Sequence, residues 1–342
     1  MKLLIYTQKV DSNDPILGFF HRWIEVFSHK YEHITVVCLY KGSVNLPSNV
    51  TVVSLGKEIG PSRFKYIRNF YIYLFKFRKN YDAVFVHMNQ EYILMGGLLW
   101  KLFGKKIYMW RNHHAGSMLT DIAAAFCTNV FCTSKFSYTA KYKKVKFMPV
   151  GIDVDIFKRD SNIQKEKTLL FLARIAPAKK PHILLEAVKQ LKDRNISATV
   201  SFYGDPLVKD KEYYTSLVEK TDAYNLKHNV SFHKGIPNTD TVPVYNKHEI
   251  FVNLSSSGMY DKTIFEAMAC ESLSIASNDN LKGEVDDSFI FREGDSTDLA
   301  RKLEWLINLS NDQKAQYGTV LRNYVCDNHS LTKLSEKLYA SI

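Results

Sequence analysis

Residues 255–277, SSSGMYDKTIFEAMACESLSIAS, predict a polar loop, a short helix and a strand. The apolar run at 249–254, just before them, has the length of a buried strand. The polar loop should therefore lie at that strand's carboxyl end, the edge of a doubly wound parallel sheet where ligands bind. A largely buried helix is expected to begin at Lys262 or Thr263, and its free N–H groups would form an anion site.

Glu266 lies within about the first turn of this expected helix. A carboxylate in that position can accept hydrogen bonds from paired hydroxyls, such as those of a ribose. Alternatively, Glu266 only stabilises the positive end of its own helix.

Residues 265–270, FEAMAC, with the apolar strand that follows them and ends in Ala276-Ser277, resemble the nucleotide-sugar signature of glycosyltransferase family 4. The resemblance covers nearly the whole chain and implies the GT-B fold, an α/β architecture with two Rossmann-like doubly wound domains facing each other across a cleft. Family members usually carry two glutamates with seven residues between them; the second matches Glu266, but the first falls on Gly258. The donor-sugar contact of that first carboxylate is therefore not carried over.

Length and composition agree with a two-domain globular protein. The chain has 342 residues, of which 46% are apolar and 13% aromatic, enough for two packed cores. Neither a long uncharged apolar run nor a signal peptide is seen, so a cytoplasmic protein is expected. The five cysteines are scattered and mostly lie in apolar runs, which is typical of reduced core residues.

The net charge of +11 points to an anionic partner. Nucleic acid, anionic lipid and nucleotide phosphate are all anionic partners of this kind. No zinc-finger, RNP-type or helix-turn-helix pattern accompanies the charge, so nucleic acid is not the expected partner.

The first residues predict a β-loop-α-β unit: a strand at 2–7, a helix opened by Gly18 and ending near residue 28, and a buried strand at 34–39. Many relatives place a Gly-rich loop after the first strand, where the backbone approaches the donor. Gly18 resembles a reduced form of that loop.

Residues 63–81, RFKYIRNFYIYLFKFRKNY, interleave cations with aromatic and aliphatic residues in a helical-looking run. Such a helix suits an anionic membrane surface, where rings enter the interface and cations meet phosphates. A half-buried helix whose Lys and Arg stems extend over packed rings explains the pattern equally well.

A predicted strand at 106–110 ends in the sequence RNHH. Residues 110–113, WRNH, resemble a WYTH-like segment of some relatives, in which the histidine lies beside the donor sugar. The resemblance assigns that place to His113, with His114 as its rival. A surface histidine pair without such a role is the alternative.

Residues 147–157, FMPVGIDVDIF, resemble the PxGxDxxxF signature that closes the first domain. The expected domains are 1–160, which would bind the acceptor, and 161–328, which would bind the nucleotide sugar. The best candidate for the linker between them is 158–167. A C-terminal helix at 329–342 is expected to cross back to the first domain. Asp153 and Asp155 form a DxD string, which binds a divalent metal in another class of transferases. Because this string is embedded in a turn, a structural role is preferred and no metal is expected.

A loop at 173–181, ARIAPAKKP, follows the predicted strand 168–172 and resembles the family's GRLxxxKG segment. Arg174 and Lys179 match its charged positions, and Ala173 and Lys180 replace its glycines. At a strand's carboxyl end, Arg174 and Lys179 can neutralise a leaving diphosphate. A solvated basic loop is the alternative.

Further positions follow from the resemblance. Strand-to-glycine patterns end at Gly204 and Gly235, and the loop 234–237 is the expected base site. Asp261 is either a substitute sugar contact for the carboxylate missing at Gly258 or the cap of the helix that follows it. The implied catalytic residues are His113, Arg174 and Lys179, and the implied donor-binding residues are Gly18, Gly204, Lys234, Gly235, Gly258, Met259, Tyr260, Asp261, Lys262, Thr263 and Glu266.

The resemblance implies a retaining glycosyltransferase of the hexosyl or a related class, acting in glycan, polysaccharide or glycolipid assembly. It would move a sugar from a nucleotide-sugar donor to a sugar or lipid-linked acceptor without cofactor or metal, with the departing phosphate helping to deprotonate the acceptor hydroxyl. Catalysis would come from positioning and from stabilisation of the diphosphate charge. Two alternatives remain: a nucleotide-sugar-binding protein without transferase activity, and a basic nucleic-acid-binding protein.

Overall fold

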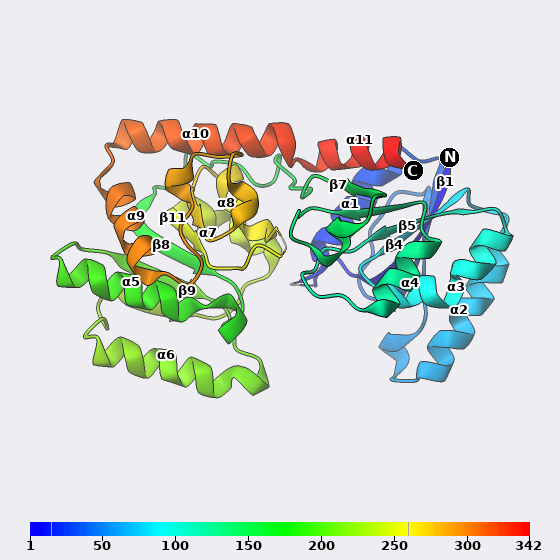
Figure 1. Ribbon diagram of the computed structural model, residues 1–342, viewed down its shortest axis with the longest axis horizontal. Coiled ribbons are helices and arrows are strands. Elements are labelled where there is room, and N and C mark those ends of the chain that lie inside the picture. Colours follow the sequence, from blue (N-terminus) through cyan, green and yellow to red (C-terminus); the bar gives the residue numbers. More distant parts are fainter. Residues whose placement is uncertain (15, 259) are drawn as a thin grey trace. The chain divides into compact units, whose positions relative to one another are not determined.

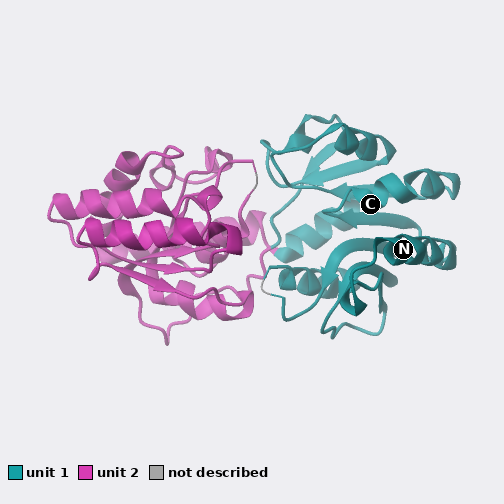
Figure 2. Cartoon of the chain, turned by 90° about the horizontal axis from the view of Figure 1, so that it is seen from below, with its two compact units in different colours: residues 1–151, 331–342 teal, residues 152–330 magenta. Residues whose placement is uncertain are grey.

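The computed structural model describes residues 1–14, 16–258 and 260–342. The chain forms two compact units (Figure 2): unit 1 is Met1–Gly151 with Leu331–Ile342, and unit 2 is Ile152–Ser330. Each unit has a parallel sheet with helices packed against it (Figure 1), which confirms the predicted α/β class.

Unit 1 contains a parallel sheet in the order β3-β2-β1-β4-β5-β6-β7. Its strands are β1 (Lys2–Val10), β2 (His33–Lys41), β3 (Val50–Ser54), β4 (Ala83–His87), β5 (Lys106–Trp110), β6 (Asn129–Cys132) and β7 (Val145–Phe147). Its helices are α1 (Gly18–Ser28), α2 (Arg63–Phe77), α3 (Glu91–Leu102), α4 (Met118–Phe126) and α11 (Leu331–Ser341). The strand order reverses between β1 and β4, so the sheet is doubly wound.

Two apolar cores lie on opposite faces of the unit 1 sheet. Alternating β1 residues are divided between them, because successive side chains of a strand point to opposite faces. Leu3 packs with residues of α1 and α11, whereas Leu4 packs with residues of α2, α3 and α4. Helix α11 contributes Leu334 and Leu338 to the first core, and this burial holds the C-terminal residues in unit 1.

Unit 2 contains a smaller parallel sheet in the order β10-β9-β8-β11-β12. Its strands are β8 (Glu166–Leu172), β9 (Thr199–Tyr203), β10 (Val230–His233), β11 (His248–Asn253) and β12 (Leu273–Ala276). Its helices are α5 (Pro181–Asp193), α6 (Lys211–Ala223), α7 (Thr241–Lys247), α8 (Lys262–Ala269), α9 (Ser296–Asn308) and α10 (Asn311–Asn328). The order reverses between β8 and β11, so the loops after these two strands flank the topological switch point.

Short 3-10 turns complete the secondary structure. They are η1 (Lys57–Ile59), η2 (Tyr138–Lys141), η3 (Pro177–Lys179), η4 (Val208–Asp210), η5 (Asn238–Asp240), η6 (Asp279–Leu281) and η7 (Asp287–Phe289). None of the described helices has the length and apolar character needed to span a bilayer.

The segment expected to link the domains is anchored within unit 2. Arg159 Nη1 donates to Asn246 Oδ1 at 3.0 Å, and the backbone N–H of Asp160 donates to the same oxygen at 2.8 Å. The Asn246 side chain is fully buried, so this segment is held to α7 rather than free. The chain passes from unit 1 to unit 2 between Gly151 and Ile152, earlier than the composition of 158–167 suggested.

Candidate functional site

Lys179 and Asp261 form an ion pair at the switch point of unit 2. Lys179 ends the η3 turn after β8, and Asp261 lies in the loop after β11. The Lys179 Nζ to Asp261 Oδ2 distance is 2.5 Å, and Ser255 Oγ accepts from Lys179 at 3.0 Å while donating to Asp261 at 2.9 Å. The two loops that flank the switch point are therefore joined by one polar network.

Asp261 is also the N-cap of α8. Its Oδ1 accepts from the backbone N–H of Thr263 at 3.3 Å and from Thr263 Oγ1 at 2.9 Å. Burial alone would raise the pKa of Asp261, but the Lys179 charge and the hydrogen bonds from Lys179, Ser255 and Thr263 hold that pKa below its usual range. The capping alternative for Asp261 is thus what the contacts show, and the ion pair with Lys179 is an addition that the local sequence did not indicate.

Glu266 lies one turn into α8 and is only 3% exposed. Its Oε1 accepts from Asn238 Nδ2 and its Oε2 accepts from the Tyr245 hydroxyl, each at 3.1 Å. Burial raises the pKa of Glu266, against the opposing influence of the Lys262 charge and these two hydrogen bonds. The carboxylate is therefore oriented by two neighbours from η5 and α7 before any ligand binds.

Lys262 and Thr263 are the first residues of α8. Burial lowers the pKa of Lys262 to about 8, although the nearby carboxylates of Glu266 and Asp153 favour its charged form. A cation is also disfavoured at a helix N-terminus by the macrodipole. An anionic ligand bound at this helix start would offset both effects.

Lys180 makes a second connection between loops at the same edge. It adopts the left-handed conformation with φ +52°, which glycine adopts more readily than residues with a side chain. Its ammonium pairs with Glu293, and Ser256 Oγ donates to the same carboxylate oxygen at 2.7 Å. The Ser255-Ser256 pair after β11 is thus held by two separate Lys-carboxylate pairs.

The remaining predicted phosphate and base positions lie on neighbouring loops. Arg174 is exposed after β8 and makes no hydrogen bond or ion pair with the described part of the chain. A Cβ at Gly204 would lie 1.9 Å from the carbonyl oxygen of Ala173, so the close approach of the β8 and β9 ends requires glycine there. Lys234 is exposed after β10, and the Gly235 backbone N–H donates to Asp205 Oδ2 at 3.0 Å.

The β11–α8 loop holds three further predicted positions. Gly258 lies in a turn, and Met259 lies outside the described residues. Tyr260 is 8% exposed, its hydroxyl donates to the carbonyl oxygen of Asn280 at 2.7 Å, and its ring packs edge-on against Phe265. The Tyr260 side chain therefore packs in the interior of unit 2, and only the backbone of this residue is left to contact a ligand.

Gly18 and His113 belong to unit 1. Gly18 is the first residue of α1, and its N–H donates to the carbonyl oxygen of Asp14 at 3.0 Å. His113 follows β5, accepts from the Ala115 N–H at 2.9 Å through Nδ1, and stacks on His114 with ring centroids 4.4 Å apart. The rival histidines are thus in direct ring contact, and His113 is the one whose orientation is fixed by a backbone hydrogen bond.

Helix α2 is partly buried, as the packing alternative for residues 63–81 expected, and membrane binding by this helix stays a prediction. Phe70 and Leu74 are buried against the sheet. Phe64 is 79% and Ile72 is 50% exposed, and Ile67 and Phe75 are also exposed. One edge of the helix therefore packs into unit 1 while its aromatic and aliphatic remainder faces outward among Arg and Lys side chains.

Asp153 and Asp155 have the turn geometry expected of a structural role. Asp153 Oδ1 accepts from the Asp155 N–H at 3.2 Å, and its carbonyl oxygen accepts from Phe157 at 2.8 Å. Across the described residues, no group of three or more His, Cys, Asp or Glu side chains is arranged to hold a metal ion. All five cysteines are free thiols.

The supporting residues of the site are those that sequence reasoning missed. Asn238 and Tyr245, which hold Glu266, belong to no recognisable motif, so nothing in the sequence marks them. Ser255 and Ser256 did carry a signal, because polar residues directly after a buried strand lie at the ligand-binding edge. Glu293 lies far along the chain from Lys180, and only the fold brings them together.

The two solved structures most useful for comparison share this fold at low sequence identity. HepE of Anabaena, solved with UDP, superposes with a TM-score of 0.78 and 16% identity, covering 100% of this chain and 99% of HepE. Sucrose-phosphate synthase of Thermosynechococcus elongatus gives 0.78 and 14%, covering 99% and 97%. These likenesses, together with two doubly wound parallel sheets, define the class: the fold is that of GT-B glycosyltransferases.

The sequence of unit 2 is similar to that of known glycosyltransferases. Residues 153–319 match the model of the family "Glycosyl transferases group 1". "Putative glycosyltransferase YtcC" of Bacillus subtilis (strain 168) is 26% identical over 133 residues, which are 38% of this chain. The aligned part spans 32% of YtcC, about a third of that relative's length.

Proposed function

We propose that this protein is a retaining glycosyltransferase of family 4 that moves a sugar from a nucleoside-diphosphate sugar to an acceptor hydroxyl. The observation that carries the proposal is the network of Lys179, Ser255 and Asp261 at the switch point of unit 2, with Glu266 one turn into the adjoining helix. Cations and a helix N-terminus bind phosphates, and an oriented carboxylate binds paired ribose hydroxyls. The family match of residues 153–319 supports the same reading.

The donor site is assigned to unit 2. Arg174 and Lys179 act on the diphosphate, and the loops ending in Gly204 and Gly235 with Lys234 contact the nucleoside. Gly258, Asp261, Lys262 and Thr263 surround the sugar and phosphate end, and Glu266 holds the ribose. HepE has been solved with UDP and with UDP-glucose, which makes uridine nucleotides the first donors to test here.

In the proposed reaction the acceptor oxygen attacks the anomeric carbon from the side of the leaving group. The departing phosphate oxygen takes the acceptor's proton, so configuration is retained without a protein nucleophile. Arg174 and Lys179 stabilise the charge that accumulates on the diphosphate, which is a transition-state effect. No metal ion or cofactor takes part in this scheme. Unit 1 binds the acceptor, while its residue His113 has a catalytic role and its residue Gly18 contacts the donor.

The acceptor is proposed to be a sugar or a lipid-linked saccharide met at the inner face of a membrane. Helix α2 supports this choice, because it exposes Phe64 and Ile72 beside exposed Arg63 and Arg68. Apolar side chains enter the bilayer interface while cations meet anionic headgroups. Such an acceptor places the protein in glycan, polysaccharide or glycolipid assembly.

The proposal is tested by an assay of sugar transfer. Nucleoside diphosphates of different bases are first screened by thermal shift, since the preferred ligand stabilises the folded protein by mass action. The corresponding nucleotide sugars are then assayed with chelator present, and NMR of the product gives its anomeric configuration. Retention with undiminished activity in chelator is the expected result; inversion, or a strict need for metal, contradicts the proposed mechanism.

Variants separate the transferase from a protein that only binds nucleotide sugars. Arg174→Ala should lower turnover more than donor affinity. The matched control is Arg194→Ala, which removes an exposed arginine that caps the C-terminus of α5 and pairs with Glu304. If the native protein binds nucleotide sugars but produces neither hydrolysis nor transfer with any acceptor, the binding-protein alternative is correct.

A further inference from the structure

Unit 2 has a cavity of about 260 Å³. It lies between the loop 284–289 and α10, and its lining includes neither Lys179, Asp261 nor Glu266. Drug-sized ligands occupy pockets of about 300–1,000 Å³. The cavity is therefore sized for a smaller molecule than a nucleotide.

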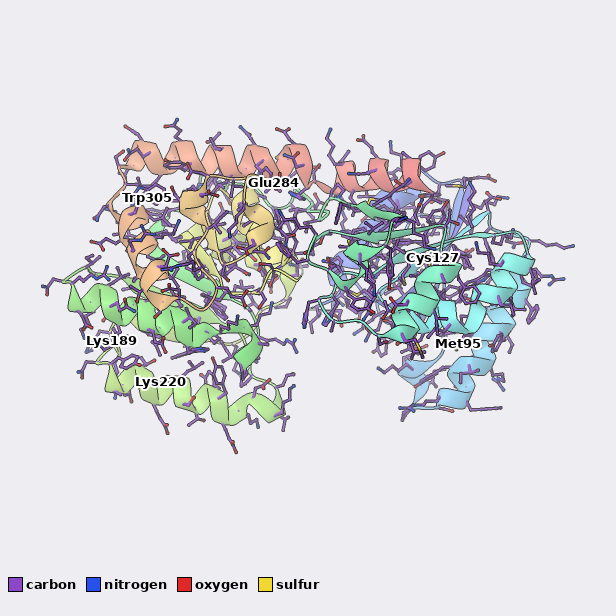
Figure 3. The ribbon with its side chains drawn as sticks, viewed as in Figure 1. Met95, Cys127, Lys189, Lys220, Glu284 and Trp305 are labelled. Atoms are coloured by element: carbon purple, nitrogen blue, oxygen red, sulfur yellow. The ribbon has the colours of Figure 1, made fainter. Side chains whose placement is uncertain are left out.

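One side of the cavity is an apolar wall built from fixed rings. Phe289 and Tyr317 line it, and both contact Trp305 (labelled in Figure 3). The three ring centroids lie 5.3 to 5.7 Å apart with edge-on geometry. Mutual contact of this kind stabilises the arrangement of the rings. Phe289 is only 1% exposed, so Tyr317 and the exposed Val320 form the accessible part of the wall. Val285 and Leu321 extend the wall with aliphatic carbon.

The rest of the lining is polar and rich in hydrogen-bond acceptors. Glu284 (Figure 3) and Asp286 contribute carboxylates, and hydrogen bonds from Ser288 hold the pKa of Asp286 below its usual range. Gln313 and Gln316 contribute amides from α10. Gln313 Oε1 accepts from the Ser310 N–H at 2.9 Å, which leaves its NH2 group to donate elsewhere.

The charge of this lining is opposite to that of the protein. Neither lysine nor arginine is among the described residues that line the cavity, although the chain carries a net charge of +11. Two carboxylates without a lining cation repel an anion and accept hydrogen bonds from hydroxyl or ammonium groups.

We propose that this cavity binds one pyranose ring of a sugar that carries no negative charge, at a site separate from the donor site. The apolar C–H face of the ring packs on Tyr317 and Val320, and its hydroxyls are bound by the Glu284 carboxylate and the Gln316 amide. A few placed polar groups beside an apolar wall are the usual composition of a small-ligand site. The site concerns binding alone, so it stands whether or not transfer is observed.

The experiment is ligand-observed NMR titration of the full chain with methyl glucoside, methyl galactoside, methyl N-acetylglucosaminide and glucosamine, with glucuronate as the anionic counterpart. At least one uncharged or amino sugar is expected to bind saturably, with Kd of about 1 mM, typical of a single ring with few contacts. Glucuronate is expected to bind at least about tenfold more weakly.

Variants assign the binding to this cavity. Glu284→Gln and Gln316→Ala, both at exposed positions, should each weaken the sugar at least about fivefold. Asn323→Ala, which removes an exposed amide from α10 outside the lining, and Glu266→Gln in the donor site should leave the affinity unchanged. The proposal is overturned if no sugar binds saturably, if glucuronate binds as tightly, or if both cavity variants retain native affinity.

Discussion

The Lys179 ammonium lies 2.5 Å from the Asp261 carboxylate, and Ser255 bridges the two side chains. The same carboxylate caps α8, so one acidic residue neutralises the expected phosphate-binding lysine and orders the helix start beside it. A diphosphate that uses Lys179 must therefore compete with Asp261 for this cation.

Removing the charge of Asp261 should strengthen the binding of free nucleoside diphosphate. In Asp261→Asn the cap is kept, because Asn is as good an N-cap as Asp, while Lys179 loses its internal partner. We expect affinity to rise by a few-fold to about tenfold, in the lower range of charge-assisted hydrogen bonds, because the pair is partly exposed. Isothermal titration calorimetry measures the affinity of both proteins for the nucleoside diphosphate.

The matched control is Asp295→Asn, which alters another capping aspartate of unit 2 that is also ion-paired, in this case with Arg292. Its nucleotide affinity should equal that of the native protein. Weaker binding in Asp261→Asn, with the control unchanged, would show that the Asp261 carboxylate itself contacts the ligand.

The same carboxylate makes folding stability depend on pH. Its pKa is lower in the folded chain than in the unfolded chain, so its contribution is fully present above the unfolded value of about 3.9 and is lost as pH falls through the folded value. Asp261→Ala should lower the free energy of unfolding by about 0.5–2 kcal/mol at neutral pH. Denaturant titrations should show that this difference shrinks in strong acid.

Glu266→Gln should weaken nucleotide binding without lowering the folding stability. Because burial raises the pKa of Glu266, ionising this side chain costs more free energy in the folded chain than in the unfolded chain. The Gln variant should therefore be at least as stable as the native protein at pH 7, and this advantage should vanish below the usual glutamate pKa of about 4.3.

Nucleotide binding should weaken in the same variant by about 10- to 100-fold, the equivalent of about 1.5–3 kcal/mol for charge-assisted hydrogen bonds. Calorimetry on the folded variant provides the measurement. Native affinity in a variant of native stability would exclude Glu266 as the ribose ligand.

Nucleoside diphosphate binding should take up a proton at mildly alkaline pH. Burial lowers the pKa of Lys262 to about 8, and a phosphate beside it would raise that pKa again. Around pH 8.5 much of the free protein has a neutral Lys262 that becomes charged on binding, so affinity should fall as pH rises further.

Calorimetry in buffers of different ionisation enthalpy gives the number of protons that are taken up when the nucleoside diphosphate binds. Uptake should be close to half a proton or more at that pH, and Lys262→Met should abolish most of it. The control Lys234→Met removes a cation at an exposed position of the same edge and should leave the uptake intact. Equal uptake in native protein and Lys262→Met would place the phosphates elsewhere.

Helix α2 should bind anionic bilayers. Phe64→Glu and Ile72→Glu replace exposed apolar residues, so they should reduce sedimentation with anionic vesicles without affecting folding. Neutral phosphatidylcholine vesicles should retain little protein, because the attraction of Lys and Arg to acidic headgroups is missing.

Val208→Glu is the matched control, since Val208 is an apolar residue of unit 2 with 84% exposure. It should bind anionic vesicles like the native protein. If native protein and all three variants sediment equally with neutral and anionic vesicles, α2 is a packing helix only and the acceptor is not presented by an anionic membrane.

Local sequence was sufficient for the elements around the site. The apolar run at 249–254 and the polar loop and helix that follow it were predicted from periodicity, and the structure has β11 at His248–Asn253 and α8 at Lys262–Ala269. Alternating strands and helices likewise indicated parallel sheets, because such a chain must cross over between strands. Helices α6 and α10 escaped prediction: α10 buries only Gly318, Leu321 and Val325 along 18 residues, so its apolar stripe is too sparse to recognise.

Around the site, the sequence by itself determined the strand end, the helix start and the residue types that stand at each, because these depend on neighbours a few positions away. Only the tertiary structure decided that Lys179 would be neutralised by Asp261, that Asn238 and Tyr245 would hold Glu266, and that α11 would pack in unit 1. The physical reason is strand order. Which loops meet at a sheet edge depends on how β8 and β11 become neighbours, and that pairing comes from burial of whole faces rather than from any local pattern.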